Sequence, residues 1–147
     1  MKAGRCRRKE LAAGAVWARE AADRAAELFL SHRLFRSLSD GEVIDRRWLA
    51  LLYPPYWHYD VLQALLVLSR LGKAHDPRAG DALELLVRRR RADGCCQPGG
   101  SWWRPPGTGS GSGPVEVVDW GRSGPNEMIT LNALRVLHTV GWSARSR

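Results

Sequence analysis

Apolar side chains recur at helical spacing in four stretches of the chain, and each stretch predicts one helix. Over residues 10–34 they alternate with Glu and Arg among good helix formers, which is typical of a long amphipathic helix. The positions on its apolar face are Leu11, Ala15, Ala22, Ala25, Ala26 and Phe29. Turn residues at 37–41 then make the chain change direction. Residues 42–52 are expected to form an irregular connection with a short helical turn.

The second predicted helix begins just after Pro54 and Pro55. Proline removes a backbone donor and pushes the preceding residue out of the α region, so no helix can run through this pair. Over residues 61–68 only Gln63 is polar. A helix with almost no solvent face should be surrounded by other elements, so we interpret this one as an inner helix that ends at Gly72.

The third predicted helix carries a single apolar stripe. Asp76 suits its N-cap and Pro77 its first turn, and the helix is expected over residues 78–91 with Gly94 as its stop. Its apolar positions are Ala79, Ala82, Leu83 and Leu86, with the stem of Arg90. The arginines of residues 88–91 fall in the last turn, where the helix dipole favours cations. One stripe indicates an outer helix.

Residues 92–124 contain few helix formers and much Gly, Pro and Ser. Within them we expect a flexible loop at 104–114 and a short strand or extended segment at 115–118. The last helix is predicted to open at 123–127, with a cap residue, a first-turn proline and a first-turn carboxylate, and to end at Gly141. Its apolar positions are Leu131, Leu134, Leu137 and Val140. The whole pattern indicates an all-α fold of four helices.

The length of 147 residues suits one domain that buries about 68–70% of its unfolded surface. We expect a basic disordered leader at 1–9, a domain at 10–141 and a tail at 142–147. Three cysteines, two of them adjacent, give no disulfide framework and indicate a reducing compartment. No stretch reaches the roughly 18 apolar residues of a membrane span. The sequence therefore predicts a soluble cytoplasmic protein.

The net charge of +8 raises the hypothesis of nucleic-acid binding. Much of the excess lies in the two terminal segments, and the rest includes the arginines of residues 88–91. No recognised binding motif accompanies this charge, which argues against nucleic acid as a partner. A basic nucleic-acid binder is the third hypothesis, and it requires the arginine run and both tails to share one face.

Three stretches carry a family resemblance: FLSHRLFRSLSDGEVIDRRWLALLYPPYWHYDVLQALLVLSRLG, DPRAGDALELLVRRRRADG and GPNEMITLNALRVLHTVGW. Over roughly residues 20–141 the chain resembles the C-terminal part of bacterial proteins in the squalene-cyclase and prenyltransferase repeat superfamily. That family has a degenerate signal, Asp-Gly-x-Trp followed by Gly-x-Trp. DGCCQ at residues 93–97 and GSWW at residues 100–103 are similar to it, with Cys96 where an aromatic residue would be expected.

The resemblance implies an αα-toroid, in which inner and outer helices alternate. A complete ring needs more than four helices, because each helical pair buries its faces against its neighbours. The predicted architecture is therefore a partial αα-toroid. Its exposed edge is a candidate surface for a partner protein or for self-association.

Trp57, His58, Tyr59 and Asp60 precede the inner helix and are candidate ligand-binding residues. In cyclases of the resembled family, a carboxylic acid protonates an isoprenoid and aromatic faces hold the cation, at about 0.5–2 kcal/mol for each ring. Asp60 is solitary, whereas that acid belongs to an Asp-rich motif. The structural interpretation is preferred: Asp60 serves the first helical turn, the aromatic rings pack, and His58 bonds a loop carbonyl.

Protein prenyltransferases of the same fold bind zinc through Asp, Cys and His. Here Cys95 and Cys96 are adjacent and lack the usual two-residue spacing, and the four histidines show no paired pattern. We therefore predict no metal and no other cofactor. The two thiols are expected to fill packing space beneath the loop.

Four further candidates, Trp102, Trp103, Asp119 and Trp120, bracket the Gly-rich loop, and Glu127 follows them. The tryptophans could stack on an apolar or sugar-like ligand, but the resemblance favours a role as braces that tie helix ends together. A Trp brace buries its rings and hydrogen-bonds a loop through its indole donor. Glu127 is then a first-turn carboxylate.

The leading hypothesis is a non-catalytic or residual toroid domain that binds an apolar, isoprenoid-like ligand or a partner protein. The alternative is an isoprenoid cyclase or prenyltransferase, complete only with further helices or another chain. An enzyme needs a proton donor or a metal inside the cavity, and a binding module does not. The orientation of Asp60 and Asp119 is therefore the observation that separates the two.

Overall fold

The computed structural model describes residues 3–107, 114–118, 120 and 124–142, with side chains from residue 14 onward. Over these residues the chain is helical and has no named strand, which confirms the all-α class. The four α-helices are α1 (Ala3–Ser31), α2 (Val61–Arg70), α3 (Gly80–Arg88) and α4 (Glu127–Thr139). Two short 3-10 helices accompany them, η1 (Arg46–Leu49) and η2 (Pro77–Ala79).

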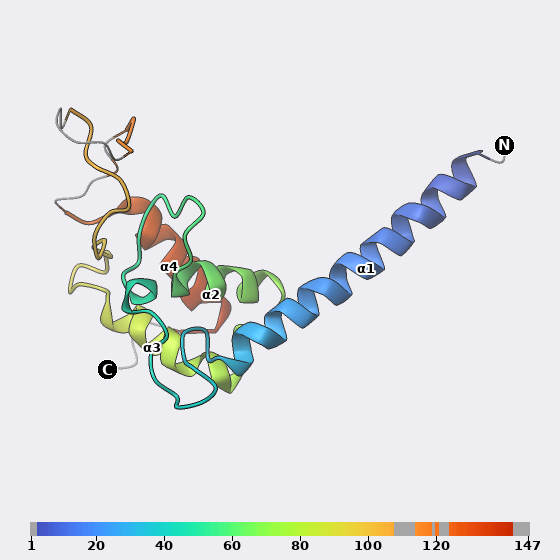
Figure 1. Cartoon of the computed structure of the whole chain (residues 1–147), viewed down its shortest axis with the longest axis horizontal. Helices are drawn as coiled ribbons and strands as arrows, with labels where there is room; N and C mark the ends of the chain where they lie inside the picture. Colours follow the sequence, from blue (N-terminus) through green and yellow to red (C-terminus); the bar gives the residue numbers. More distant parts are fainter. Residues whose placement is uncertain (1–2, 108–113, 119, 121–123, 143–147) are drawn as a thin grey trace.

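Helix α2 lies at the centre of the body and packs against α1, α3 and α4 (Figure 1). Leu65 and Leu68 are fully buried, as expected for an inner helix. Val67 differs, because it faces solvent on the side of α2 that these neighbours leave uncovered. Gly72 follows in the left-handed conformation (φ 70°), and the Lys73 amide closes the helix on the Leu68 carbonyl oxygen at 2.8 Å.

Helix α1 is longer than its pattern predicts, and half of it stands away from the body (Figure 1). It begins at Ala3, so residues 3–9 of the expected leader are helical, in keeping with their Ala, Arg and Lys content. Ala26 and Leu30 are buried, whereas residues 14–20 are exposed. Two positions of the predicted apolar face, Ala15 and Ala25, therefore contact solvent. The helix ends three residues early, before the left-handed Arg33 and Leu34.

Helix α3 is shorter than predicted. Asp76 is an N-cap as expected, since its side chain accepts a hydrogen bond from the Arg78 amide at 2.9 Å. The segment that it caps is the 3-10 helix η2, which precedes α3. The α-helix ends at Arg88, three residues before the predicted end. The chain then turns back, and the Arg91 amide donates to the Cys95 carbonyl oxygen at 2.9 Å.

Helix α4 buries a different face from the predicted one. Its buried side chains are Ile129, Ala133, Val136 and Leu137, while Leu131 and Leu134 are exposed. The leucines alone fit a helical spacing. The packing of α4 on α2, however, buries the stripe in which Leu137 lies with Ile129 and Ala133. Its N-cap is Asn126, within the predicted opening, and Gly141 ends it in the left-handed conformation.

The loop between α3 and α4 is described only in part. Residues 108–113 of the predicted flexible loop lie outside the described residues. Val115 forms an isolated parallel bridge with Arg104, so part of the segment expected at 115–118 is extended, whereas residues 117 and 118 form a bend. Among the helices that the structure describes, none combines the length and the apolar character needed to cross a bilayer.

Candidate functional site

Aromatic side chains from two distant segments meet in front of α2. The His58 ring stacks on Trp102 with centroids 3.7 Å apart, and the Tyr56 ring stacks on Trp103 at 3.9 Å. Trp57 lies beside both stacks, 5.3 Å from His58 and 5.9 Å from Trp103. We call these five residues the aromatic cluster. It contains four of the predicted site residues and one, Tyr56, that the sequence analysis did not single out.

The contacts of the aromatic cluster are those of a brace. The stacked faces of Trp102 and Trp103 are occupied by His58 and Tyr56, so they are not open to a ligand. Trp57 is the exception, with 74% of its surface exposed. One detail of the predicted brace is wrong: the buried indole nitrogen of Trp102 has no hydrogen-bond partner among the described residues.

The loop that carries these tryptophans is fixed to the segment before α2 by Gly99. Its amide donates to the Ala50 carbonyl oxygen at 2.9 Å. A Cβ atom on Gly99 would lie 2.3 Å from that oxygen, so the close approach requires glycine. The arrangement of Trp102 and Trp103 against residues 56–58 therefore depends on a backbone contact that only glycine allows.

Tyr59 points to a second site, away from the partners of His58. Its ring stacks on Phe29 at 5.7 Å and meets the edge of Trp48 at 4.8 Å. Its hydroxyl donates to the Leu34 carbonyl oxygen at 2.5 Å. Burial, with a smaller contribution from the charge of Asp60, raises the pKa of Tyr59, so it stays a neutral donor.

An apolar cleft of about 200 Å³ opens beside Tyr59, and we call it the Tyr59 cleft. Among the described residues that line it, His32 and Tyr59 are ionisable. The Nδ1 atom of His32 lies 2.8 Å from the Arg36 carbonyl oxygen. Leu28 and Ile44 at its rim are 60% and 47% exposed. The complete lining is Leu28, Phe29, His32, Leu34, Ile44, Trp48 and Tyr59.

Asp60 is the N-cap of α2 and is 1% exposed. One carboxylate oxygen accepts a hydrogen bond from the Gln63 amide at 2.9 Å, and the other accepts from the Leu52 amide at 3.2 Å. Burial raises the pKa of Asp60, although these backbone donors act in the opposite direction. Both oxygens are thus used to start the helix and to hold the preceding segment.

The remaining candidates lie near the start of α4. Trp120 meets the edge of the Tyr53 ring at 5.2 Å, and its carbonyl oxygen accepts a hydrogen bond from the Asn126 side chain. Glu127 is an exposed residue in the first turn of α4, as expected. Asp119 lies outside the described residues, so its predicted role stays a prediction.

Sequence reasoning missed two features of this region. Glu116 is buried and accepts a hydrogen bond from the Tyr56 hydroxyl. No local pattern indicated this burial, because a Glu among the valines of VEVV is expected to face solvent. Phe29 and Trp48 line the Tyr59 cleft from segments far apart in sequence, and no local pattern relates them.

The two thiols differ in their surroundings. Cys96 is fully buried, and burial raises the pKa of its thiol. Its amide donates to the Thr130 hydroxyl oxygen at 2.9 Å, and its carbonyl oxygen accepts from the Asn126 amide. Cys96 thus packs under the loop, against the start of α4, as expected, whereas Cys95 is only partly buried. Within the described part of the chain, no three His, Cys, Asp or Glu side chains gather in a way that could hold a metal ion.

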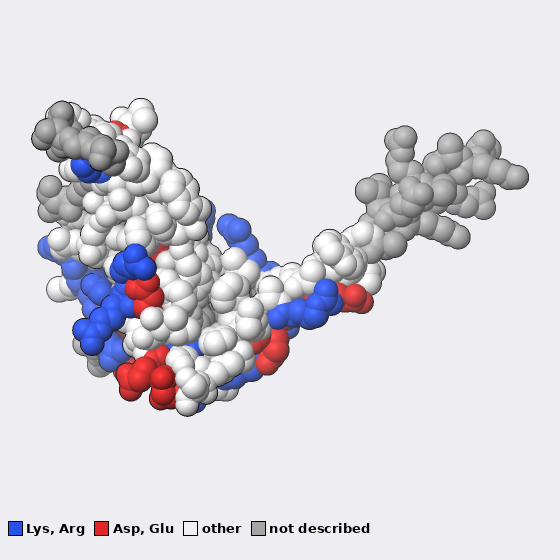
Figure 2. Space-filling model, in the orientation of Figure 1, with Lys and Arg blue, Asp and Glu red and all other residues white. Residues whose placement is uncertain are grey.

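Every arginine of residues 88–91 has a partner within the chain. Figure 2 shows basic and acidic side chains next to one another along the lower edge of the view. Such mixing weakens the local positive potential that would attract a nucleic acid. The partners are Glu84 for Arg88 (3.5 Å), the Leu49 carbonyl oxygen for Arg89 (3.1 Å), the Trp142 ring for Arg90 (4.5 Å) and Asp93 for Arg91 (3.3 Å).

No protein-family model, no curated protein and no solved structure matches this chain. The resemblance to the squalene-cyclase and prenyltransferase superfamily therefore stays a prediction from the residues.

Proposed function

We propose that this chain is a non-catalytic domain that binds an apolar, isoprenoid-like chain in the Tyr59 cleft. We further propose that its helices are part of an αα-toroid, with α2 as an inner and α3 as an outer helix. The observation that carries the ligand proposal is a cleft walled by aliphatic and aromatic side chains with an exposed aliphatic rim. The central place of α2 supports the toroid.

The size of the Tyr59 cleft limits what it holds. Pockets for drug-sized ligands are about 300–1,000 Å³, and this cleft is about 200 Å³. It would therefore enclose one end of a prenyl chain, and the rest would lie over Leu28 and Ile44. Burying the five carbons of one isoprene unit yields about 4 kcal/mol before the cost of association, so one unit alone would bind no more tightly than a Kd on the order of 1 mM. Longer chains should therefore bind more tightly.

The alternative of an isoprenoid cyclase or transferase has less support. Asp60, the carboxyl group nearest in sequence to the cleft residue Tyr59, has both oxygens bonded to backbone amides. A proton donor must reach the reacting atom, and this carboxyl group is turned into its helix cap. Nucleic-acid binding also has less support, because the arginines of residues 88–91 have partners within the chain.

Titration calorimetry with farnesol in detergent-free buffer tests the ligand proposal. We expect saturable binding that is weaker for the five-carbon prenol and weaker in Ile44→Glu, which places a charge on the cleft rim. Val117→Glu is the control. Like Ile44, Val117 is an exposed β-branched residue, but it does not line the cleft and lies far from the lining residues in sequence. Absence of saturable binding, or equal binding by the Ile44→Glu variant, would refute the proposal.

A further inference from the structure

Helix α1 carries large apolar side chains, in both its exposed and its docked half, that no described part of the chain covers. Trp17 is 67% exposed, and Val16 and Leu28 are exposed as well. Trp17, Ala21, Arg24 and Leu28 follow one another at spacings of four, three and four residues, so they lie along one face of the helix. We call this the Trp17 face.

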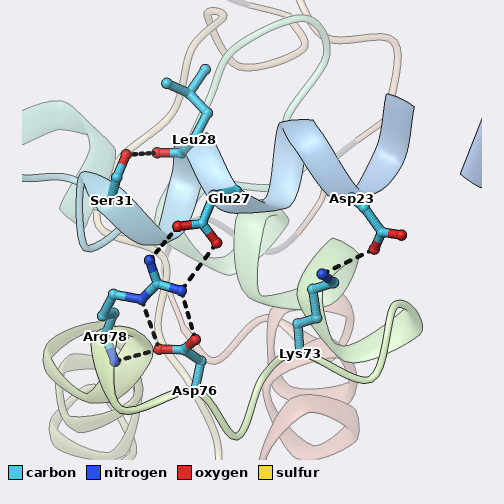
Figure 3. Close-up of polar contacts among 7 residues, drawn as sticks. All are labelled: Asp23, Glu27, Leu28, Ser31, Lys73, Asp76 and Arg78. Carbon is cyan, nitrogen blue, oxygen red and sulfur yellow. Dashed lines mark hydrogen bonds and ion pairs between the residues drawn. The ribbon is translucent and has the colours of Figure 1, made fainter. Parts of the chain in front are cut away.

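The Trp17 face points away from the body, because the opposite side of α1 is held there. Ala26 and Leu30 are buried, and two ion pairs join α1 to the connection between α2 and α3. Lys73 contacts Asp23 at 2.9 Å, and Arg78 contacts Glu27 at 2.5 Å. Figure 3 shows Asp23 and Glu27 directed toward these partners and Leu28 directed away from them.

We propose that the Trp17 face binds a second copy of this chain, with the two α1 helices antiparallel. Trp17 and Leu28 are 11 residues apart, which is about 16.5 Å along a helix. In an antiparallel pair centred between Ala22 and Asp23, Trp17 of each copy lies opposite Leu28 of the other. Leu28 forms part of the rim of the Tyr59 cleft, so the indole of one copy contacts that apolar rim on the other.

The charges on this face favour a second copy over an unrelated partner. Glu20 and Arg24 lie on the same flank of the Trp17 face, and neither forms an ion pair within the described residues. In the antiparallel pair, Glu20 of each copy lies beside Arg24 of the other. The two copies therefore form two equivalent ion pairs across the interface. A contact in which the same patch serves both chains is self-complementary, as two-fold symmetric dimers require.

Small side chains allow the two helices to approach closely. Ala21 lies within the Trp17 face, and Ala18 and Ala25 lie on the flank opposite Glu20 and Arg24. Helices with small contact residues pack at the short end of the usual interaxial range, about 8 Å. This inference does not rest on the proposed ligand, because it uses only the exposed surface of α1 and the rim of the cleft.

Sedimentation velocity of the full chain, over a series of concentrations, tests the proposal. We expect a dimer whose Kd rises at least about tenfold in Trp17→Ala, because an anchoring Trp is a typical hot spot. Trp57→Ala is the matched control: Trp57 is exposed to a similar extent but lies in the aromatic cluster, so its removal should leave the Kd unchanged. Far-UV circular dichroism establishes that each variant keeps its helices.

A charge exchange makes the test independent of the tryptophan. Glu20→Arg and Arg24→Glu should each weaken the dimer, and the double variant should restore it, because the pairs reform with reversed sign. A monomeric wild type would overturn the proposal. A dimer that is insensitive to Trp17→Ala, or that the double exchange fails to restore, would show that another surface mediates the association.

Discussion

Replacing Asp60 by Ala tests how the start of α2 is stabilised. The side chain is buried and accepts hydrogen bonds from the amides of Gln63 and Leu52. Loss of an N-cap costs about 1 kcal/mol, and a buried donor left without a partner costs about 1–3 kcal/mol. We therefore expect Asp60→Ala to lower the free energy of unfolding by about 2–4 kcal/mol.

Urea unfolding followed by circular dichroism at 222 nm measures this loss. In a thermal experiment it corresponds to a fall in Tm of about 6–12 °C, at about 3 °C for each kcal/mol in a domain of this size. Asp45→Ala is the matched control, because Asp45 caps η1 through the Arg47 amide but is partly exposed, and its loss should be smaller. Equal losses in the two variants would refute the assignment of Asp60 as a buried double acceptor.

The pH dependence of the same site gives an independent check. Burial raises the pKa of Asp60 in the folded protein, so between about pH 3.9 and that raised pKa the folded state keeps a proton that the unfolded state has released. The stability from this proton is full below about pH 3.9 and is lost as the pH rises through the folded-state pKa. Relative to Asp60→Asn, which cannot titrate, the wild type should lose stability over this range. A difference that stays constant with pH would contradict the burial argument.

Three further substitutions test the packing, each by urea unfolding. Leu65→Ala should lower the free energy of unfolding by about 2–5 kcal/mol, because it opens a cavity around the inner helix. Val67→Ala, on the exposed side of α2, should lower it much less, and equal losses would contradict the central position of α2. Gly99→Ala should destabilise the fold by about 1–3 kcal/mol, since its Cβ would overlap the Ala50 carbonyl oxygen. Gly14→Ala, in a helix with open space around it, should instead stabilise by about 0.5–1 kcal/mol, and a loss there would contradict the exposed course of α1.

The four helices, the cap at Asp76 and the glycines that end α2 and α4 could be predicted because local chemistry determines them, whereas the bounds of α1 and α3 were predicted wrongly. Asp60, Asp76 and Asn126 all accept hydrogen bonds from backbone amides at the start of a helical segment. Gly72 and Gly141 adopt positive φ after α2 and α4. These signals act over a few residues, so the sequence contains them in full.

The buried faces of α1 and α4 could not be predicted in the same way. A helix face is buried only where another element covers it, and spacing alone does not reveal that element. Leu131 and Leu134 match the helical period as well as Leu137 does, yet only the α2 contact decides which of them is buried. Ala15 is exposed because no described part of the chain lies beside that half of α1.

Four residues of the aromatic cluster were singled out from the sequence, but of the residues that line the Tyr59 cleft only Tyr59 was. The pairing of His58 with Trp102 and of Tyr56 with Trp103 joins segments more than 40 residues apart. The Tyr59 cleft combines α1, η1 and the residue before Asp60 in the same way. His58 and Tyr59 are consecutive in sequence, yet His58 stacks on Trp102 while Tyr59 lines the cleft.

Photo-crosslinking with a diazirine-bearing farnesol, followed by peptide mapping, tests the central claim that the Tyr59 cleft holds an apolar chain. We expect label on the tryptic peptide of residues 25–33, which contains Leu28, Phe29 and His32, and competition by unlabelled farnesol. Label concentrated on Trp57, Trp102 or Trp103, or spread over the chain without competition, would contradict the claim.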